Sequence, residues 1–156
     1  MMTSSVKRRS FLGGVLSAAL VGCRTGGDDS SSEPIGPLLA PAALASRLDD
    51  IKTGKIVVLY VGPDALFGRG HVPGARNVGP VDSADGRRAL SEALAKVPAE
   101  TELVLYCGCC PVRSCPNVRP ASKALRVLGR STARMLDLPT RFATDWADKG
   151  YPVERG

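Results

Sequence analysis

Two short runs of large apolar residues place the strongest constraint on the fold of this chain. Residues 55–61 have the sequence KIVVLYV, and residues 102–107 have the sequence ELVLYC. Beyond its first residue, neither run alternates apolar with polar positions, which is typical of strands buried on both faces. Strands of that kind occur almost only in parallel sheets that helices cover on both sides. A third strand is expected at 133–137, and a short extended piece near 75–78.

Helical patterns separate these runs. Leu44 and Leu48 are spaced by one helical turn, and Phe142 and Trp146 by another, which places Trp146 in a core. The segment from Phe67 to Gly79 is rich in turn residues. Helices are expected at 41–48, 84–97, 120–128 and about 140–149. The alternation predicts an α/β domain with a mainly parallel central sheet flanked by helices.

The N-terminus has the form of an export signal. Residues 1–22 combine a short basic region with an apolar run from Phe11 to Val21, too short to span a membrane. Arg8-Arg9 resembles the twin-arginine motif, and 20–23 (LVGC) resembles a bacterial lipobox. These motifs predict a signal peptide at 1–22 and lipidation of Cys23. We therefore expect an exported protein of the cell envelope or periplasm, anchored to a membrane by lipid; the alternative is an uncleaved helix.

Composition divides the rest of the chain into a tether and one domain. Residues 23–37 are rich in Gly, Ser, Asp and Pro, which predicts a flexible linker after the lipidated Cys23. Residues 38–156 are long enough for one independent core. The chain carries 21 basic and 15 acidic residues, and three of the basic ones lie in the signal, which leaves 18 − 15 = +3 beyond it. No basic run with interleaved aromatic residues favours nucleic acid as a partner.

Three segments resemble the motifs of one family. Residues 70–75 (GHVPGA) resemble the G-H-[IV]-P-G-A segment of rhodanese-like domains, and 103–107 (LVLYC) resemble their active-site strand. Trp146 followed by 150–153 (GYPV) is similar to their C-terminal motif. The resemblance covers essentially all of 38–156. It implies a rhodanese-like fold and sulfur transfer, in which Cys107 takes a sulfane sulfur from a small donor as a persulfide. The acceptor it implies is a thiol or a cyanide-like compound, and it implies no cofactor.

The sequence departs from the family in three places. An Asp-x-Arg that ends the preceding strand in many members falls here on Tyr60 and Gly62, and a Gly-Gly after the third strand is replaced near Leu138-Pro139. The loop from Cys107 to Pro120 is longer than usual and resembles that of a lipoprotein subgroup.

This loop is the predicted substrate-binding segment. A loop between a strand end and a helix start directs backbone N–H groups inward, which favours a thiolate, and nearby arginines add positive charge. Prolines within the loop lack an N–H and reduce the number of donors. The residues assigned to substrate binding are Gly108, Cys109, Cys110, Arg113, Ser114 and Arg119.

The three further cysteines of the loop allow three interpretations. Cys107 and Cys110 form a C-x-x-C, as in a redox pair, although prolines interrupt the helix that would follow. Four thiols can also bind Zn²⁺ or Cu⁺, but zinc sites usually draw ligands from two separated segments, and no metal is expected. A structural disulfide between Cys110 and Cys115 is the preferred interpretation.

The sequence is therefore compatible with two functions. One is an exported, membrane-tethered sulfurtransferase or persulfide carrier that acts through Cys107. The other is a non-catalytic, thiol-redox or metal-binding module on the same fold. His71, the only histidine, is expected to brace a turn rather than to act as a base, and Arg134 and Arg141 are expected to be solvated.

Replacing Cys23 by Ala tests the anchor. The variant lacks the sulfur that would receive lipid, so it should move from the membrane fraction to the soluble fraction after cell disruption. Fractionation followed by a salt wash measures this. A variant that remains with the membranes after the wash would show that another segment holds the protein there.

Overall fold

The computed structural model describes residues 34–156. The predicted signal peptide, the lipobox with Cys23 and most of the predicted linker lie outside the described residues and remain predictions. Among residues 34–156, no helix is both long and apolar enough to cross a membrane. Ile35 packs against the core and the Pro37 carbonyl accepts a hydrogen bond from the N–H of Met135 (2.8 Å), so the ordered domain begins a few residues before Leu38.

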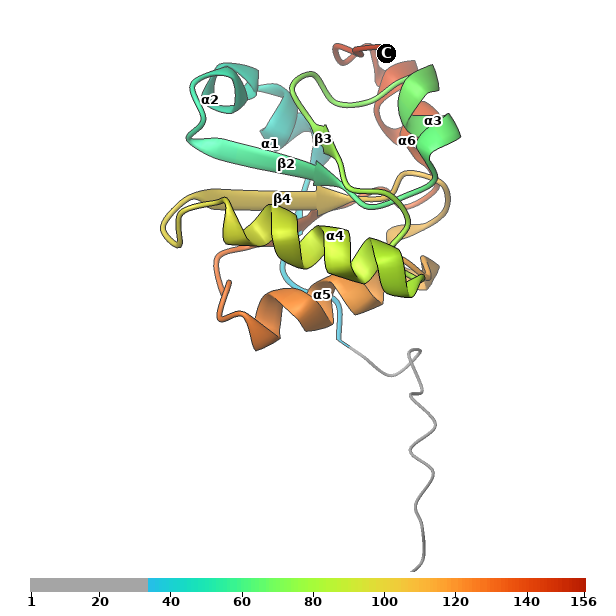
Figure 1. Cartoon of the computed structure of the whole chain (residues 1–156). Coiled ribbons are helices and arrows are strands. Elements are labelled where there is room, and N and C mark those ends of the chain that lie inside the picture. The colour runs from blue at the N-terminus through green and yellow to red at the C-terminus, as the bar shows by residue number, and fades with distance from the viewer. Residues whose placement is uncertain (1–33) are drawn as a thin grey trace, which may run out of the picture.

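A five-stranded, entirely parallel sheet forms the centre of the domain (Figure 1). The predicted α/β class with a parallel sheet is confirmed. The strands follow the order β1-β5-β4-β2-β3 across the sheet. Only β1, with two residues, was not expected from the sequence, because so short a strand leaves no apolar pattern. The strands are β1 (Leu38–Leu39), β2 (Ile56–Tyr60), β3 (Arg76–Asn77), β4 (Glu102–Tyr106) and β5 (Arg134–Leu136).

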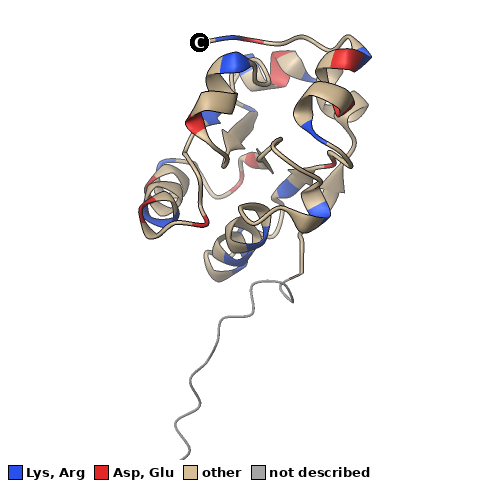
Figure 2. Ribbon diagram, turned by 90° about the vertical axis from the view of Figure 1, so that its right-hand side faces the viewer, with Lys and Arg blue, Asp and Glu red and all other residues tan. Residues whose placement is uncertain are grey.

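Helices cover both faces of the sheet (Figure 1). One face is covered by α4 (Ala84–Ala95) and α5 (Val118–Val127). The other is covered by α1 (Pro41–Ala45), α2 (Leu48–Lys52), α3 (Asp64–Arg69) and α6 (Phe142–Asp145). Two short 3₁₀ turns, η1 (Val112–Ser114) and η2 (Ala147–Lys149), complete the fold. Both signs of charge occur along the helices (Figure 2).

The buried runs divide their side chains between two cores. Leu59 and Leu105 point toward α4 and α5, whereas Tyr60 and Tyr106 point toward the opposite helices. This follows from the pleat, which directs successive side chains of a strand to opposite faces. A strand that is apolar at every position can therefore supply both cores, as the uninterrupted runs predicted.

Several helices differ from their predicted bounds. The helix expected at 41–48 is split into α1 and α2, and the one at 140–149 into α6 and η2. Asp64–Arg69 forms α3, although its second half, from Phe67, falls in the segment that the sequence predicted to be rich in turns. The break after α6 falls at Trp146, whose indole N–H donates to the carbonyl of Pro152 (2.8 Å) and whose side chain is fully buried. The predicted core position of Trp146 is confirmed.

The pairing of β2 with β4 positions the carboxyl edge of the sheet. Tyr60 lies opposite Tyr106, and the N–H of Val61 extends the ladder by donating to the carbonyl of Tyr106 (2.9 Å). Both strands therefore end at the same level. As a result, Gly62 and Cys107 lie beside each other at this edge.

Replacing Gly74 by Val should destabilise the domain. Gly74 has a φ of 77°, and an added Cβ would lie 2.9 Å from Cγ2 of Ile51. The backbone strain costs about 1–3 kcal/mol, and the contact adds about 1–3 kcal/mol. Thermal and urea denaturation measure the loss.

Gly54→Val is the matched control. Gly54 has a φ of 78°, but no atom lies within 4 Å of an added Cβ. The control should therefore lose only the strain contribution, and equal losses in the two variants would contradict the proposed contact with Ile51.

Candidate active site

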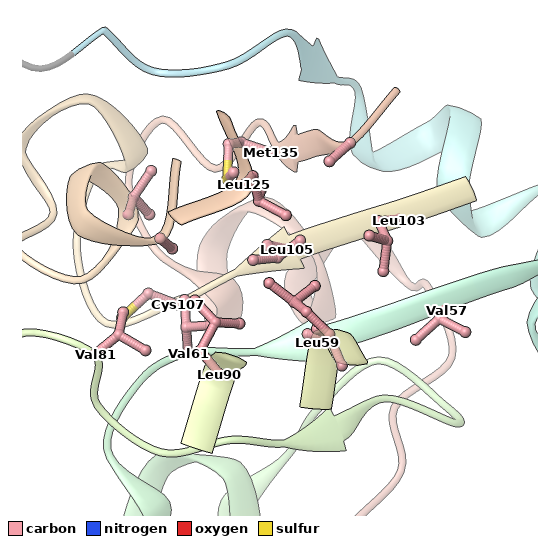
Figure 3. Close-up of a cluster of buried hydrophobic side chains, with 14 of the residues drawn as sticks. Val57, Leu59, Val61, Val81, Leu90, Leu103, Leu105, Cys107, Leu125 and Met135 are labelled. Carbon is pink, nitrogen blue, oxygen red and sulfur yellow. The ribbon is translucent and has the colours of Figure 1, made fainter. Parts of the chain in front are cut away.

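Cys107 lies directly after β4, at the carboxyl edge of the parallel sheet. Its side chain is 1% exposed and belongs to the core beneath α4 and α5. Figure 3 shows it at one end of that core, close to Val61 and Val81. The alternation along β4 dictates this direction, because Leu105 points to the same face two residues earlier.

The loop after Cys107 folds back so that the sulfurs of its cysteines lie close to Cys107 Sγ. The Sγ atoms of Cys107, Cys109 and Cys115 all lie within 4.8 Å of one another. The distance from Cys107 Sγ to Cys109 Sγ is 3.1 Å, and that from Cys109 Sγ to Cys110 Sγ is 3.0 Å. Cys115 is as buried as Cys107, whereas Cys109 and Cys110 are half-buried. The fold thus gathers four thiols that the sequence showed only as neighbours along one loop.

Asn117 joins this thiol cluster to the rest of the domain. Its side chain is buried, its Oδ1 accepts a hydrogen bond from the N–H of Asp82 (3.1 Å), and its Nδ2 donates to Cys107 Sγ (3.7 Å). The sequence analysis did not single out Asn117. The available signal was its position two residues after Cys115, at the start of α5.

Cys107 and Cys115 share their ionisation. The hydrogen bond from Cys107, together with backbone N–H groups of Asn117 and Val118, lowers the pKa of Cys115 to about 6 against the effect of burial. The same hydrogen bond raises the pKa of Cys107 far above its ordinary value, and burial raises it again. The pair therefore carries one negative charge near neutral pH, held mainly on Cys115, and one proton between the two sulfurs.

All four loop cysteines are free thiols in the structure. The predicted Cys110–Cys115 disulfide therefore remains a prediction. Burial raises the pKa of Cys110, so that thiol is protonated at neutral pH. Three convergent sulfurs, from Cys107, Cys109 and Cys115, also form a ligand set that suits a soft ion such as Cu⁺ or Zn²⁺.

A cavity of about 420 Å³ opens beside Cys107. Its wall includes Cys107 and Cys109, with Leu66, Phe142 and Val153 as apolar lining. Three arginines also line it: Arg69, Arg141 and Arg155. None of the described residues that line it is acidic. The cavity is thus an electropositive recess next to the thiol, and Arg141, expected from the sequence to be solvated, is part of it.

Of the other residues of the predicted loop, Arg113, Ser114 and Arg119 do not line the cavity, whereas Gly108 does. Arg113 and Ser114 are exposed in and around η1, and Arg119 Nη2 donates to the carbonyl of Arg113 (2.9 Å), which ties the loop to α5. Gly108 lines the cavity with a φ of 78°, and an added Cβ would lie 2.8 Å from Cβ of Phe142. Positive charge near Cys107 therefore comes from α3, α6 and the C-terminus, not from the loop.

Gly62 explains one departure from the family motif. A Cβ at this position would lie 2.8 Å from Cys107 Sγ and 2.6 Å from Oη of Tyr60. Tyr60 Oη in turn donates to the carbonyl of Pro63 (3.1 Å). An arginine side chain at position 62 has no room here, because the thiol and the phenol occupy the space that it would need.

His71 braces the segment before β3. Its ring stacks on Phe67 at 3.7 Å between centroids, and its Nδ1 lies 2.9 Å from the carbonyl of Phe67. Its backbone pairs with Glu154, whose carboxylate lies 3.8 Å from Nε2. His71 does not line the cavity beside Cys107, and these contacts support the bracing role.

Comparison with solved structures decides the fold family. A rhodanese-like domain from the Alr3790 protein of Anabaena superposes with a TM-score of 0.53 at 20% identity, covering 78% of this chain and 81% of that domain. The described chain has a rhodanese-like fold. The BH2092 protein from Bacillus halodurans superposes on it with a TM-score of 0.58 at 18% identity, covering 77% of each chain. No protein-family model matches the sequence, and no curated protein matches it.

The same fold also matches part of a larger protein. EanB, which has been solved in complex with hercynine, superposes with a TM-score of 0.57 at 17% identity. The match covers 77% of this chain but 28% of EanB. A rhodanese-like fold thus accounts for the parallel sheet and its flanking helices, while the chemistry of this chain has to be argued from its own residues.

Replacing Gly62 by Ala should impair Cys107 selectively. The added methyl group would displace the thiol or Tyr60, and we expect sulfur loading of Cys107 to slow by about tenfold or more, since small misplacements at a reacting atom are costly. Intact-mass measurement over time after addition of a sulfane donor gives the rate. Gly36→Ala is the control, because its added Cβ meets only the Ala133 carbonyl at 3.8 Å. Equal rates for the two variants would contradict the contact.

Proposed function

We propose that this protein is a sulfurtransferase or persulfide carrier that takes a sulfane sulfur on Cys107. The observation that carries the proposal is the place of this thiol: it ends a central parallel strand, pairs with a second buried thiol and borders an arginine-lined cavity. Ligands of parallel α/β sheets bind at this edge. The rhodanese-like fold supports the same assignment.

The first step is ionisation of Cys107 within the thiol pair. The proton between the two sulfurs moves onto Cys115, which leaves the thiolate on Cys107, the member of the pair that lines the cavity. Asn117 Nδ2 donates to this sulfur and stabilises its charge. With thiosulfate as donor, the Cys107 thiolate attacks the outer sulfur, a new S–S bond forms, and sulfite leaves with the electrons of the broken bond.

The second step passes the sulfur on. A thiolate or cyanide attacks the outer sulfur of the Cys107 persulfide, which returns Cys107 as a thiolate and releases the acceptor with its new sulfur. Both donors and acceptors of this chemistry are anions. Arg69, Arg141 and Arg155 favour anions in the cavity, and the apolar wall adds contact area for an organic group.

The proposal includes a location. The twin-arginine and lipobox patterns of residues 8–23 support export and attachment to a membrane of the cell envelope through lipid on Cys23. The domain would then act on small sulfur compounds outside the cytoplasm.

A second candidate function is a thiol-redox or metal-binding module without sulfur transfer. The observation that favours it is the convergence of the Sγ atoms of Cys107, Cys109 and Cys115. It predicts oxidation or metal binding in place of a stable added sulfur.

Cys107→Ser distinguishes the two functions. Serine keeps the size of the side chain, but its oxygen cannot carry a sulfane sulfur, so transfer from thiosulfate to cyanide should fall to background. Thiocyanate formation and the intact mass of the loaded protein are the measurements, made in the presence of a chelator. The control is Cys110→Ser, which removes a thiol of the same loop that does not line the cavity of Cys107 and should still form thiocyanate. An added sulfur retained in Cys107→Ser would refute the assignment.

A further inference from the structure

Cys115 is a buried thiol whose Sγ lies within 4.8 Å of Cys107 Sγ, and the transfer cycle uses it to hold a proton but not as a nucleophile. We propose that Cys115 resolves the persulfide of Cys107, closing an internal Cys107–Cys115 disulfide and releasing the sulfane sulfur as hydrosulfide. The proposal rests on the proposed persulfide at Cys107. It gives the protein a further activity, the two-electron reduction of sulfane sulfur.

Access limits what Cys115 can react with. Cys107 and Cys115 are equally buried, each 1% exposed, but only Cys107 is among the residues that line the cavity. A donor or an acceptor in the cavity therefore meets Cys107 and not Cys115. Within the described chain, the sulfur atoms close to Cys115 are those of the same cluster, so its nucleophilicity is directed at its neighbours.

Hydrogen bonding and position distinguish Cys115 from the other loop thiols. Backbone N–H groups at the start of α5, from Asn117 and Val118, donate to its sulfur. Thiol–disulfide exchange needs a thiolate as the attacking group, and such donors stabilise one. Cys110 is not among the three cysteines whose sulfurs converge within 4.8 Å of one another.

Ring size separates Cys115 from Cys109. Although Cys109 Sγ lies 3.1 Å from Cys107 Sγ, one residue separates the two in the chain, and a bond between them would close a small strained ring. Cys107 and Cys115 are separated by a loop long enough to let both side chains take ordinary disulfide geometry. The two sulfurs lie within 4.8 Å of each other, so a shift within the loop is enough to bring them to the bonding distance of about 2.05 Å.

The step balances as follows. The persulfide takes the proton from Cys115, and the Cys115 thiolate attacks the inner sulfur, Sγ of Cys107. The Cys107–Cys115 bond forms, the bond to the outer sulfur breaks, and that sulfur leaves as HS⁻ with the bonding electrons. The two cysteines are oxidised by two electrons, and the sulfane sulfur is reduced by two. An external dithiol of the thioredoxin type must reduce the disulfide before another cycle.

The experiment uses the full, reduced protein with a chelator and thiosulfate, without acceptor or added reductant. We expect about one equivalent of sulfide per chain, a protein mass lower by two hydrogen atoms, and a proteolytic map in which peptides with Cys107 and Cys115 are joined. A wild-type protein that keeps its added sulfur and releases no sulfide would overturn the proposal while leaving the proposed persulfide intact.

Variants separate the possible resolving thiols. Cys115→Ser should keep its added sulfur and release at least tenfold less sulfide, whereas Cys110→Ser and Cys109→Ser, which alter the same loop, should still close the Cys107–Cys115 disulfide and release the sulfur as sulfide. Cys115→Ala replaces the serine variant if that variant does not fold. The peptide map of the wild-type protein tests the Cys107–Cys115 disulfide without any variant. Trapping of the sulfur in Cys110→Ser in place of Cys115→Ser would overturn the assignment. If none of the proteins, including Cys115→Ser, gains a sulfur, the proposed function itself fails.

Discussion

The in-register parallel pairing of β2 with β4 is the interaction on which the rest of the structure depends. Tyr60 lies opposite Tyr106, so both strands end at the same edge, and Gly62 comes beside Cys107. A shift of one residue would turn Cys107 to the opposite face of the sheet, because side chains alternate along a strand. The contact of the thiol with the start of α5 would then be lost. The register of β2 and β4 therefore places Cys107, and the loop that follows adds the other thiols around it.

The ionisation of the buried thiol pair depends on the groups packed around it. A single cysteine at the position of Cys107 would be an ordinary buried thiol, protonated and inert. Placing Cys115 next to it, under N–H groups from α5, stabilises one negative charge on the pair inside the core. The Oδ1 of Asn117 holds the loop before α4, and its Nδ2 faces Cys107. Helices α4 and α5 therefore belong to the chemistry of the site as well as to its support.

Different groups surround Cys107 on its two sides. Toward the interior lie the thiols of the loop, which handle the proton and, as proposed, the disulfide. Toward solvent lies the cavity, whose arginines come from α3, the start of α6 and the C-terminal segment. Segments far apart in the sequence thus supply the arginines of the cavity, which in the proposed function favour an anion, while one continuous loop supplies the sulfurs.

The sequence by itself determined the fold class and the place of Cys107, because uninterrupted apolar strands and a cysteine at a strand end are local patterns. It also placed Trp146 in the core from its spacing to Phe142. It missed β1 and α3, which are too short for a periodic signal, and it assigned the positive charge to Arg113 and Arg119. Only the tertiary structure decided that Arg69, Arg141 and Arg155 line the cavity, that Asn117 contacts the thiol, and that Cys115 returns to Cys107. The physical reason is that these contacts join separate elements, and their distances depend on strand register and loop path rather than on spacing along the chain.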